Sequence, residues 1–190
     1  SFVAVAKNDV PVDHWFRLGR TLTYAKGEPA LVSWSGSMFE YLMPPLFMES
    51  YPNTLMDESC RVAIEQQIKY AAEKDIPWGT SEASYYNFDV QQVYQYQAFG
   101  IPSLGYKRGL SQDLVVAPYA SMLALPFTPQ AVMQNLEWFE KLKMWGLYGL
   151  YESVDFSPAL VLAQPLRYLF AQRGSAHKLV HLLLWQQFVL

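Results

Sequence analysis

Two glutamates lie in segments rich in aromatic residues and glycine, and their setting points most clearly to chemistry. Glu82 lies in PWGTSEASY at residues 77–85, and Glu152 lies in YGLYESVDF at residues 148–156. Aromatic side chains that exclude water raise the pKa of a nearby carboxyl group, which suits a general acid. Cleavage of a glycosidic bond uses two carboxyl groups that flank this bond, and flat aromatic faces can stack on sugar rings. The two segments therefore predict a carbohydrate-active site.

A structural interpretation of the same two acids stays open at this point. Either glutamate can serve as a helix cap or pair with Lys107 or Arg108. Among the weaker acidic candidates, Asp57, Glu58 and Asp113 lie near predicted helix starts. Glu40 follows the stretch at residues 34–39 and is itself expected to line a cavity. These candidates are Glu40, Asp57, Glu58, Asp89, Asp113 and Asp155.

Neither a metal nor an organic cofactor is expected. His177 and His181 have the i,i+4 spacing of metal ligands, but no glutamate follows His177 as the metalloprotease helix requires. Cys60 is the only cysteine, which excludes an intramolecular disulfide and a four-cysteine zinc site. The P-loop and the Gly-x-Ser-x-Gly motif are both absent.

The composition is that of a folded chain without a basic surface. Of the 190 residues, 52% are hydrophobic, 16% aromatic and 16% charged, and the net charge is -3. This content supplies enough apolar surface for one domain and argues against nucleic-acid binding. The longest apolar run, Leu179–Leu190, is shorter than the ~18 residues of a membrane span.

Helical periodicity identifies the elements that must position the two acids. We predict helices over about 37–43, 57–73 and 128–144, the last with Pro129 at its first position and Gly146 as its end. A short helix after Ser111 or Asp113 is limited by Pro118, and 177–190 forms a final helix. Residues 76–109 are rich in aromatic residues and punctuated by glycine and proline, so we predict long loops with at most short elements there. No hairpin turn of the Asn-Gly type occurs in the sequence. The pattern predicts a mainly α-helical architecture.

Several longer stretches carry a resemblance to a known family. They are HWFRLGR at 14–20, SWSGSMFEYLMP at 33–44, SYP at 50–52, PWG at 77–79, SE at 81–82, YQY at 94–96, AFG at 98–100, KRGL at 107–110, DLVVAPY at 113–119 and residues 148–158. With them the chain resembles the glycoamylase-like domain of cyclic β-1,2-glucan synthases, which is related to endo-β-1,2-glucanases. The match covers about residues 13–158, and Ser81-Glu82 and Tyr151-Glu152 follow the synthase pattern. Residues 172–190 share only Ala176-His177 with it and are atypical.

The resemblance implies an all-α (α/α)6 toroid with the site in its central cavity. Since twelve helices need far more than 190 residues, we expect residues 1–190 to be a fragment with about half of the helices. By resemblance, the parent is a larger, multidomain synthase at the cytoplasmic face of a bacterial inner membrane, and this piece is soluble. The implied reaction cleaves linear β-1,2-glucan and rejoins it into a ring with retention, without metal or cofactor. The alternatives are an inverting endo-β-1,2-glucanase and a non-catalytic or truncated glucan-binding module.

Roles for individual residues follow from the resemblance. Glu82 and Glu152 match the catalytic carboxylates. We expect Glu152 to be the general acid, because Tyr148, Tyr151 and Phe156 would desolvate it, and Glu82 to be the nucleophile or base. The expected substrate-binding residues are Trp34, Glu40, Trp78, Tyr85, Tyr94, Tyr151 and Asp155.

Overall fold

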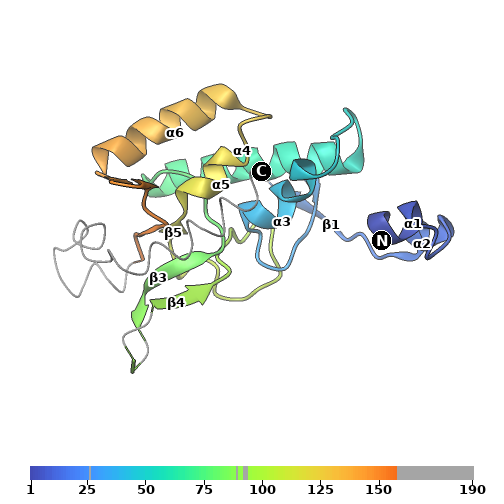
Figure 1. The fold of residues 1–190 in the computed structure, drawn as a ribbon, viewed down its shortest axis with the longest axis horizontal. Helices are drawn as coiled ribbons and strands as arrows, with labels where there is room; N and C mark the ends of the chain where they lie inside the picture. Colours follow the sequence, from blue (N-terminus) through green and yellow to red (C-terminus); the bar gives the residue numbers. More distant parts are fainter. Residues whose placement is uncertain (26, 89, 92–93, 158–190) are drawn as a thin grey trace.

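The computed structural model describes residues 1–25, 27–88, 90–91 and 94–157, which form helices and short antiparallel sheets (Figure 1). The helices are α1 (Phe2–Ala6), α2 (Asp13–Arg17), α3 (Met38–Leu42), the 3-10 helix η1 (Pro44–Leu46), α4 (Leu55–Lys74), α5 (Pro118–Met122) and α6 (Pro129–Lys141). The strands are β1 (Leu22–Ala25), β2 (Glu28–Leu31), β3 (Ala83–Phe88), β4 (Tyr94–Gln97), β5 (Val115–Val116), β6 (Trp145–Gly146), β7 (Gly149–Leu150) and β8 (Val154–Asp155). They pair as β1–β2, β3–β4, β5–β8 and β6–β7.

The mixture of helices and sheets shows that the all-α prediction was too narrow. The largest difference falls in residues 76–109, where loops were expected and β3 pairs with β4. These strands read ASYYNF and YQYQ, and aromatic residues favour a pleated, half-buried surface even without a typical turn sequence. The toroid and the count of its helices remain predictions, and the atypical tail, the 177–190 helix and His177 and His181 lie outside the described residues.

Helix α4 confirms the clearest helix prediction and is slightly longer than expected. Thr54 caps its start by accepting a hydrogen bond from the backbone N–H of Asp57, and Asp57 and Glu58 supply the acidic first turn. Asp75 ends the helix in the left-handed conformation, with φ of 54°. Lys69 and Glu65 form an exposed i,i+4 ion pair on the expected solvated face.

The ends of the shorter helices differ from expectation in two places. Helix α6 begins with Pro129 as predicted, but it ends at Lys141, and Lys143 rather than Gly146 takes the left-handed conformation (φ 56°). Pro118 starts α5 instead of limiting an earlier helix, because Val115–Val116 are paired with β8 as a strand. Proline at a first helical position has no N–H to lose, so starting a helix is its favourable role.

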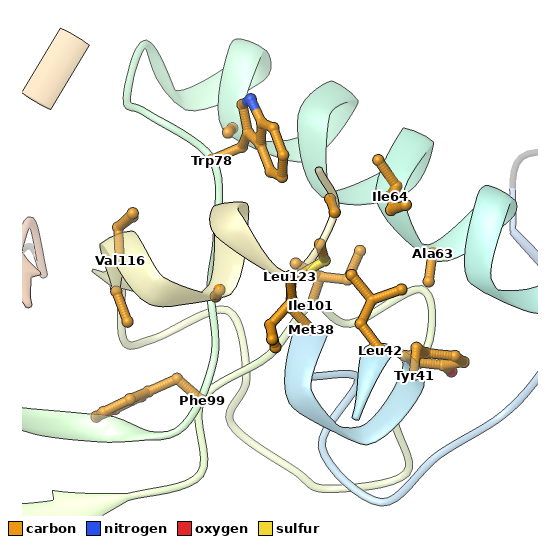
Figure 2. Packing of buried hydrophobic residues seen from close by; sticks show 14 of the residues in the cluster. Met38, Tyr41, Leu42, Ala63, Ile64, Trp78, Phe99, Ile101, Val116 and Leu123 are labelled. Atoms are coloured by element: carbon orange, nitrogen blue, oxygen red, sulfur yellow. The ribbon is translucent and has the colours of Figure 1, made fainter. Parts of the chain in front are cut away.

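The hydrophobic core lies between α3, α4 and α5 (Figure 2). Met38 and Leu42 of α3 face Ala63 and Ile64 of α4, and Leu123 joins them just after α5. Cys60 is buried as predicted, and burial raises the pKa of its thiol to about 11. In Figure 1, α6, α4 and the β3–β4 hairpin follow one another from top to bottom. No helix within the described ranges is long and apolar enough to cross a membrane.

Candidate active site

A buried glutamine of α4 holds the segment that leads to Glu82. The side-chain amide of Gln67 donates to the carbonyl oxygen of Thr80 at 2.9 Å and accepts from the N–H of Thr80 at 2.9 Å. The same amide nitrogen donates to the carbonyl oxygen of Gly36 at 3.2 Å. Gln67 is 1% exposed, so these bonds replace water that the buried backbone lacks. Nothing in the sequence marks Gln67 as part of the site, since a glutamine in a helix usually faces solvent.

A buried asparagine of α6 holds the same segment two residues earlier. Asn135 accepts from the N–H of Trp78 at 3.0 Å and donates to the carbonyl oxygen of Trp78 at 2.7 Å. It also donates to the hydroxyl of Ser121 at 2.8 Å. Two side-chain amides, from α4 and α6, thus fix residues 78–80 by pairing with the backbone as a neighbouring strand would.

The first turn of α3 continues this support to Glu82 itself. The N–H of Met38 donates to the carbonyl oxygen of Thr80, and the N–H of Phe39 donates to the hydroxyl of Ser81. The hydroxyl of Tyr119 lies 2.9 Å from that of Ser81 and 3.0 Å from the carbonyl oxygen of Glu82. A carbonyl oxygen only accepts, so the single Tyr119 proton points to Glu82 and the Ser81 hydroxyl donates to Tyr119. The result is a chain of hydrogen bonds that fixes the backbone of Glu82.

Glu40 is enclosed by serines and does not line a cavity as a free carboxyl group. Its carboxylate accepts from the hydroxyls of Ser33 (2.9 Å), Ser35 (2.6 Å) and Ser37 (3.2 Å), and from the N–H groups of Ser35 and Ser37. With Ser37 it forms the capping box of α3. Burial alone would raise the pKa of Glu40, but the hydrogen bonds from Ser35, Ser37 and Ser33 outweigh it and lower that pKa. Glu40 is therefore a fixed negative charge.

The fixed charge of Glu40 acts on Glu82. Burial is the main cause that raises the pKa of Glu82, and the negative charge of Glu40 adds to the effect. A hydrogen bond from Tyr96 opposes both. A carboxyl group with a raised pKa keeps its proton to higher pH, as a general acid must.

Glu152 is tied to the strand that starts just after Glu82. Its Oε1 atom accepts a hydrogen bond of 3.1 Å from the N–H of Ser84, and the hydroxyl of Ser153 donates to the carbonyl oxygen of Ser84. The pairing of Val115 with Asp155 in β5–β8 holds the following residues. Since Glu82 and Ser84 are two residues apart, the structure brings the two predicted acids to one end of β3.

Neither acid caps a helix, which was one of the two structural roles considered for them. Glu82 precedes a strand and Glu152 lies between β7 and β8, so neither begins a helix. Lys107 donates to the carbonyl oxygen of Ala98 at 2.7 Å. The aromatic cover expected around Glu152 is also thinner than predicted, because Tyr148 is 66% exposed.

The predicted substrate-binding residues are distributed over several places. Trp34 is 65% exposed, whereas Trp78 is 6% exposed and packs in the core (Figure 2), which corrects the prediction that its ring faces a cavity. Tyr85 is half-buried with its ring edge against Phe99, at 5.1 Å between centroids. The ring of Tyr151 lies against Gly146. Asp155 accepts a hydrogen bond from the N–H of Ser157. The side chain of Tyr94 is outside the described part of the structure.

A cavity of about 200 Å³ is lined by residues of the segment 97–113 and by neither of the two acids. Gln97, Lys107, Arg108 and Asp113 supply its polar walls, and Phe99 and Leu110 are among its apolar ones. Gln97 and Tyr96 are successive residues of β4 and point to opposite faces, so this cavity and the acids belong to different faces of the hairpin. Among the residues that the structure describes, no group of three or more His, Cys, Asp or Glu is placed to hold a metal ion.

Comparison with known proteins agrees with the resemblance noted from the sequence. The Glycoamylase family, described as "Putative glucoamylase", matches residues 2–174. The cyclic beta-(1,2)-glucan synthase NdvB of Rhizobium meliloti is 44% identical over 161 residues, which are 85% of this chain. The chain spans only 6% of the length of that protein.

Proposed function

Because this chain belongs to the Glycoamylase family, we propose that it forms part of a domain that cleaves linear β-1,2-glucan and rejoins the chain into a ring. The substrate class comes from the relative, which is named as a cyclic glucan synthase. The reaction type comes from the two carboxyl groups at one end of β3.

One observation carries this proposal: Glu152 accepts the N–H of Ser84, two residues from Glu82. Glycosidic cleavage needs two carboxyl groups at one bond, held by backbone and not by free loops. Glu82 is fixed through Ser81 and Tyr119, and Glu152 through Ser84. The pair is therefore preorganised by three separate elements, α3, α5 and β3.

We assign the proton to Glu82, which reverses the roles expected from the sequence. Burial and the charge of Glu40 raise the pKa of Glu82, which favours Glu82 as the proton donor. Glu152 accepts a hydrogen bond from the backbone N–H of Ser84, and such a bond suits a carboxylate nucleophile. In the first step Glu152 attacks the anomeric carbon, the glycosidic C–O bond breaks, and the Glu82 proton goes to the leaving oxygen. In the second step an acceptor hydroxyl attacks that carbon, its proton returns to Glu82, and Glu152 is released.

The acceptor decides between ring closure and hydrolysis. A hydroxyl at the other end of the glucan gives a ring, while water gives a shorter linear chain. The exposed ring of Trp34 provides an apolar face for a sugar near the Ser33–Ser37 segment, and we propose it as a glucan contact. The chain acts as part of a larger synthase, in keeping with its small share of the relative's length.

The test is incubation of the complete protein that carries this chain with linear β-1,2-glucan. Products are analysed by mass spectrometry, since a ring is lighter by one water than the linear chain of equal length. Rings support the proposal; linear products alone support the hydrolase alternative. Unchanged glucan that still binds the protein supports the non-catalytic binding module and contradicts both.

A further inference from the structure

The register of the β3–β4 hairpin brings a tyrosine to Glu82. Ala83 pairs with Gln97 and Ser84 pairs with Tyr96, so Tyr96 is the diagonal neighbour of Glu82 on one face of the hairpin. Diagonal neighbours are within reach of an aromatic side chain. The hydroxyl of Tyr96 lies 3.5 Å from Oε2 of Glu82.

Resting on the proposed function, we propose that Tyr96 is a positioning residue that selects which oxygen of the Glu82 carboxyl group carries the catalytic proton. A phenol hydroxyl that donates to Oε2 makes Oε2 the accepting oxygen, so the proton of a neutral Glu82 sits on Oε1. Oε1 is then the atom that delivers the proton to the leaving glycosidic oxygen. On return of the proton in the second step, the same hydrogen bond restores the same arrangement.

Tyr96 keeps its own proton throughout the working range, as this role requires. Burial raises the pKa of Tyr96 to about 12, and the charges of Glu82 and Glu152 add to the effect. The titratable groups that face it are Glu82 before β3, Glu152 between β7 and β8, and Tyr119 of α5. Burial also raises the pKa of Tyr119, so both phenols stay neutral in this range.

The long distance between Tyr96 and Glu82 and the exposure of Tyr96 fit a hydrogen bond that tightens when substrate binds. A separation of 3.5 Å is at the long end for a hydrogen bond, and such contacts shorten when substrate closes a site. Tyr96 is 55% exposed and belongs to no core cluster of the described residues. Replacement by phenylalanine therefore removes the hydroxyl and leaves the packing unchanged.

The kinetic test is Tyr96→Phe in the complete protein. The hydrogen bond from Tyr96 lowers the pKa of Glu82, so its loss raises that pKa and moves the alkaline limb of the kcat profile to higher pH. We expect kcat at the optimum to fall on the order of 10-fold with little change in KM, because the proton donor is misaligned. The control is Tyr24→Phe, an exposed tyrosine of β1, which leaves both quantities as in the wild type.

A second readout separates this proposal from the proposed function. Carbon NMR of the glutamate carboxyl groups follows the titration of Glu82, with its signal assigned by Glu82→Gln. A higher midpoint in Tyr96→Phe supports the role of Tyr96 even where glucan is not cleaved. Absence of cleavage by the wild-type protein counts against the proposed function alone. An unchanged midpoint, or an alkaline limb that does not move, overturns the role of Tyr96.

Discussion

The backbone N–H of Ser84 donates to the carboxylate of Glu152 at 3.1 Å, across 68 positions of the chain. This bond joins the segment after β7 to the first residues of β3, which Glu82 directly precedes. Because the donor of this hydrogen bond is a backbone group, the relative position of Glu82 and Glu152 depends on how firmly residues 78–84 are held in place. Groups that hold this segment should therefore affect activity as well as the acids themselves.

Removing the fixed charge beside Glu82 shifts the pH dependence to the acid side. Glu40→Gln abolishes the charge that helps to raise the pKa of Glu82, so that pKa falls and the general acid loses its proton at lower pH. We expect the alkaline limb of kcat to move to lower pH, opposite to Tyr96→Phe. The exposed Glu65→Gln is the control and leaves the limb in place. A shift to higher pH in Glu40→Gln would show that Glu40 does not act through its charge.

Gln67 is expected to contribute more to the free energy of unfolding than a glutamine on the surface of a helix. Gln67→Met leaves the buried N–H of Thr80 without its partner, at a cost of about 1–3 kcal/mol, whereas the carbonyl oxygen of Thr80 keeps the hydrogen bond from Met38. We expect a loss of about 1–3 kcal/mol in the free energy of unfolding, measured by urea denaturation. Gln134→Met, at an exposed position of α6, should change it by less than about 0.5 kcal/mol. Equal effects of the two substitutions would contradict the pairing.

Asn135 donates to the carbonyl oxygen of Trp78, and an ionised aspartate cannot replace this hydrogen bond. In Asn135→Asp a carboxylate oxygen faces the carbonyl oxygen of Trp78 and the hydroxyl of Ser121. We expect a loss of about 3–5 kcal/mol, as for an unpaired buried charge. The loss should shrink at acid pH, where a protonated carboxyl group donates again. Denaturation at mildly acidic and mildly basic pH measures this, with exposed Asn53→Asp as control; a pH-independent loss would argue against it.

Ser35, one of the serines around Glu40, packs so closely against Gly100 that there is no room for a Cβ atom at this position. A Cβ atom on Gly100 would lie 1.9 Å from the carbonyl oxygen of Ser35, a backbone atom that must then move. We expect Gly100→Ala to destabilise the protein by about 1–3 kcal/mol. We also expect lower activity, because the shift of Ser35 disturbs the hydrogen bonds that fix Glu40. Gly19→Ala meets no atom within 4 Å and serves as the matched control. Wild-type thermal stability in Gly100→Ala would show that this contact is absent.

The parts that the sequence predicted are those with strong local signals. Helix α4 carries a cap, an acidic first turn and a solvated i,i+4 ladder, and α6 starts at Thr128-Pro129, so both were predictable. Ser37 and Glu40 form a Ser-x-x-Glu capping box, a signal that is present in the sequence and would have identified Glu40 as a capping residue and not a cavity-lining one. The β3–β4 hairpin has no such signal, because its pairing depends on contacts outside the segment.

Of the proposed site, only the two acids were predictable from the sequence. Their aromatic, glycine-containing segments are visible in the sequence, and the fold brings them to one end of β3. The groups that set their properties, Gln67, Asn135 and the serines around Glu40, are ordinary polar residues whose burial follows from tertiary packing. For the same reason the sequence placed Trp78 on a cavity wall, whereas packing places it in the core.

Turnover of linear β-1,2-glucan by Glu82→Gln and Glu152→Gln, each compared with the wild-type protein, is the decisive measurement. Both substitutions keep the shape of the side chain and remove its ability to give a proton or act as nucleophile. With folding verified by circular dichroism, we predict that each variant loses ~10²–10⁴-fold in turnover. Near-normal turnover in either variant would contradict the assignment of that carboxyl group to the reaction.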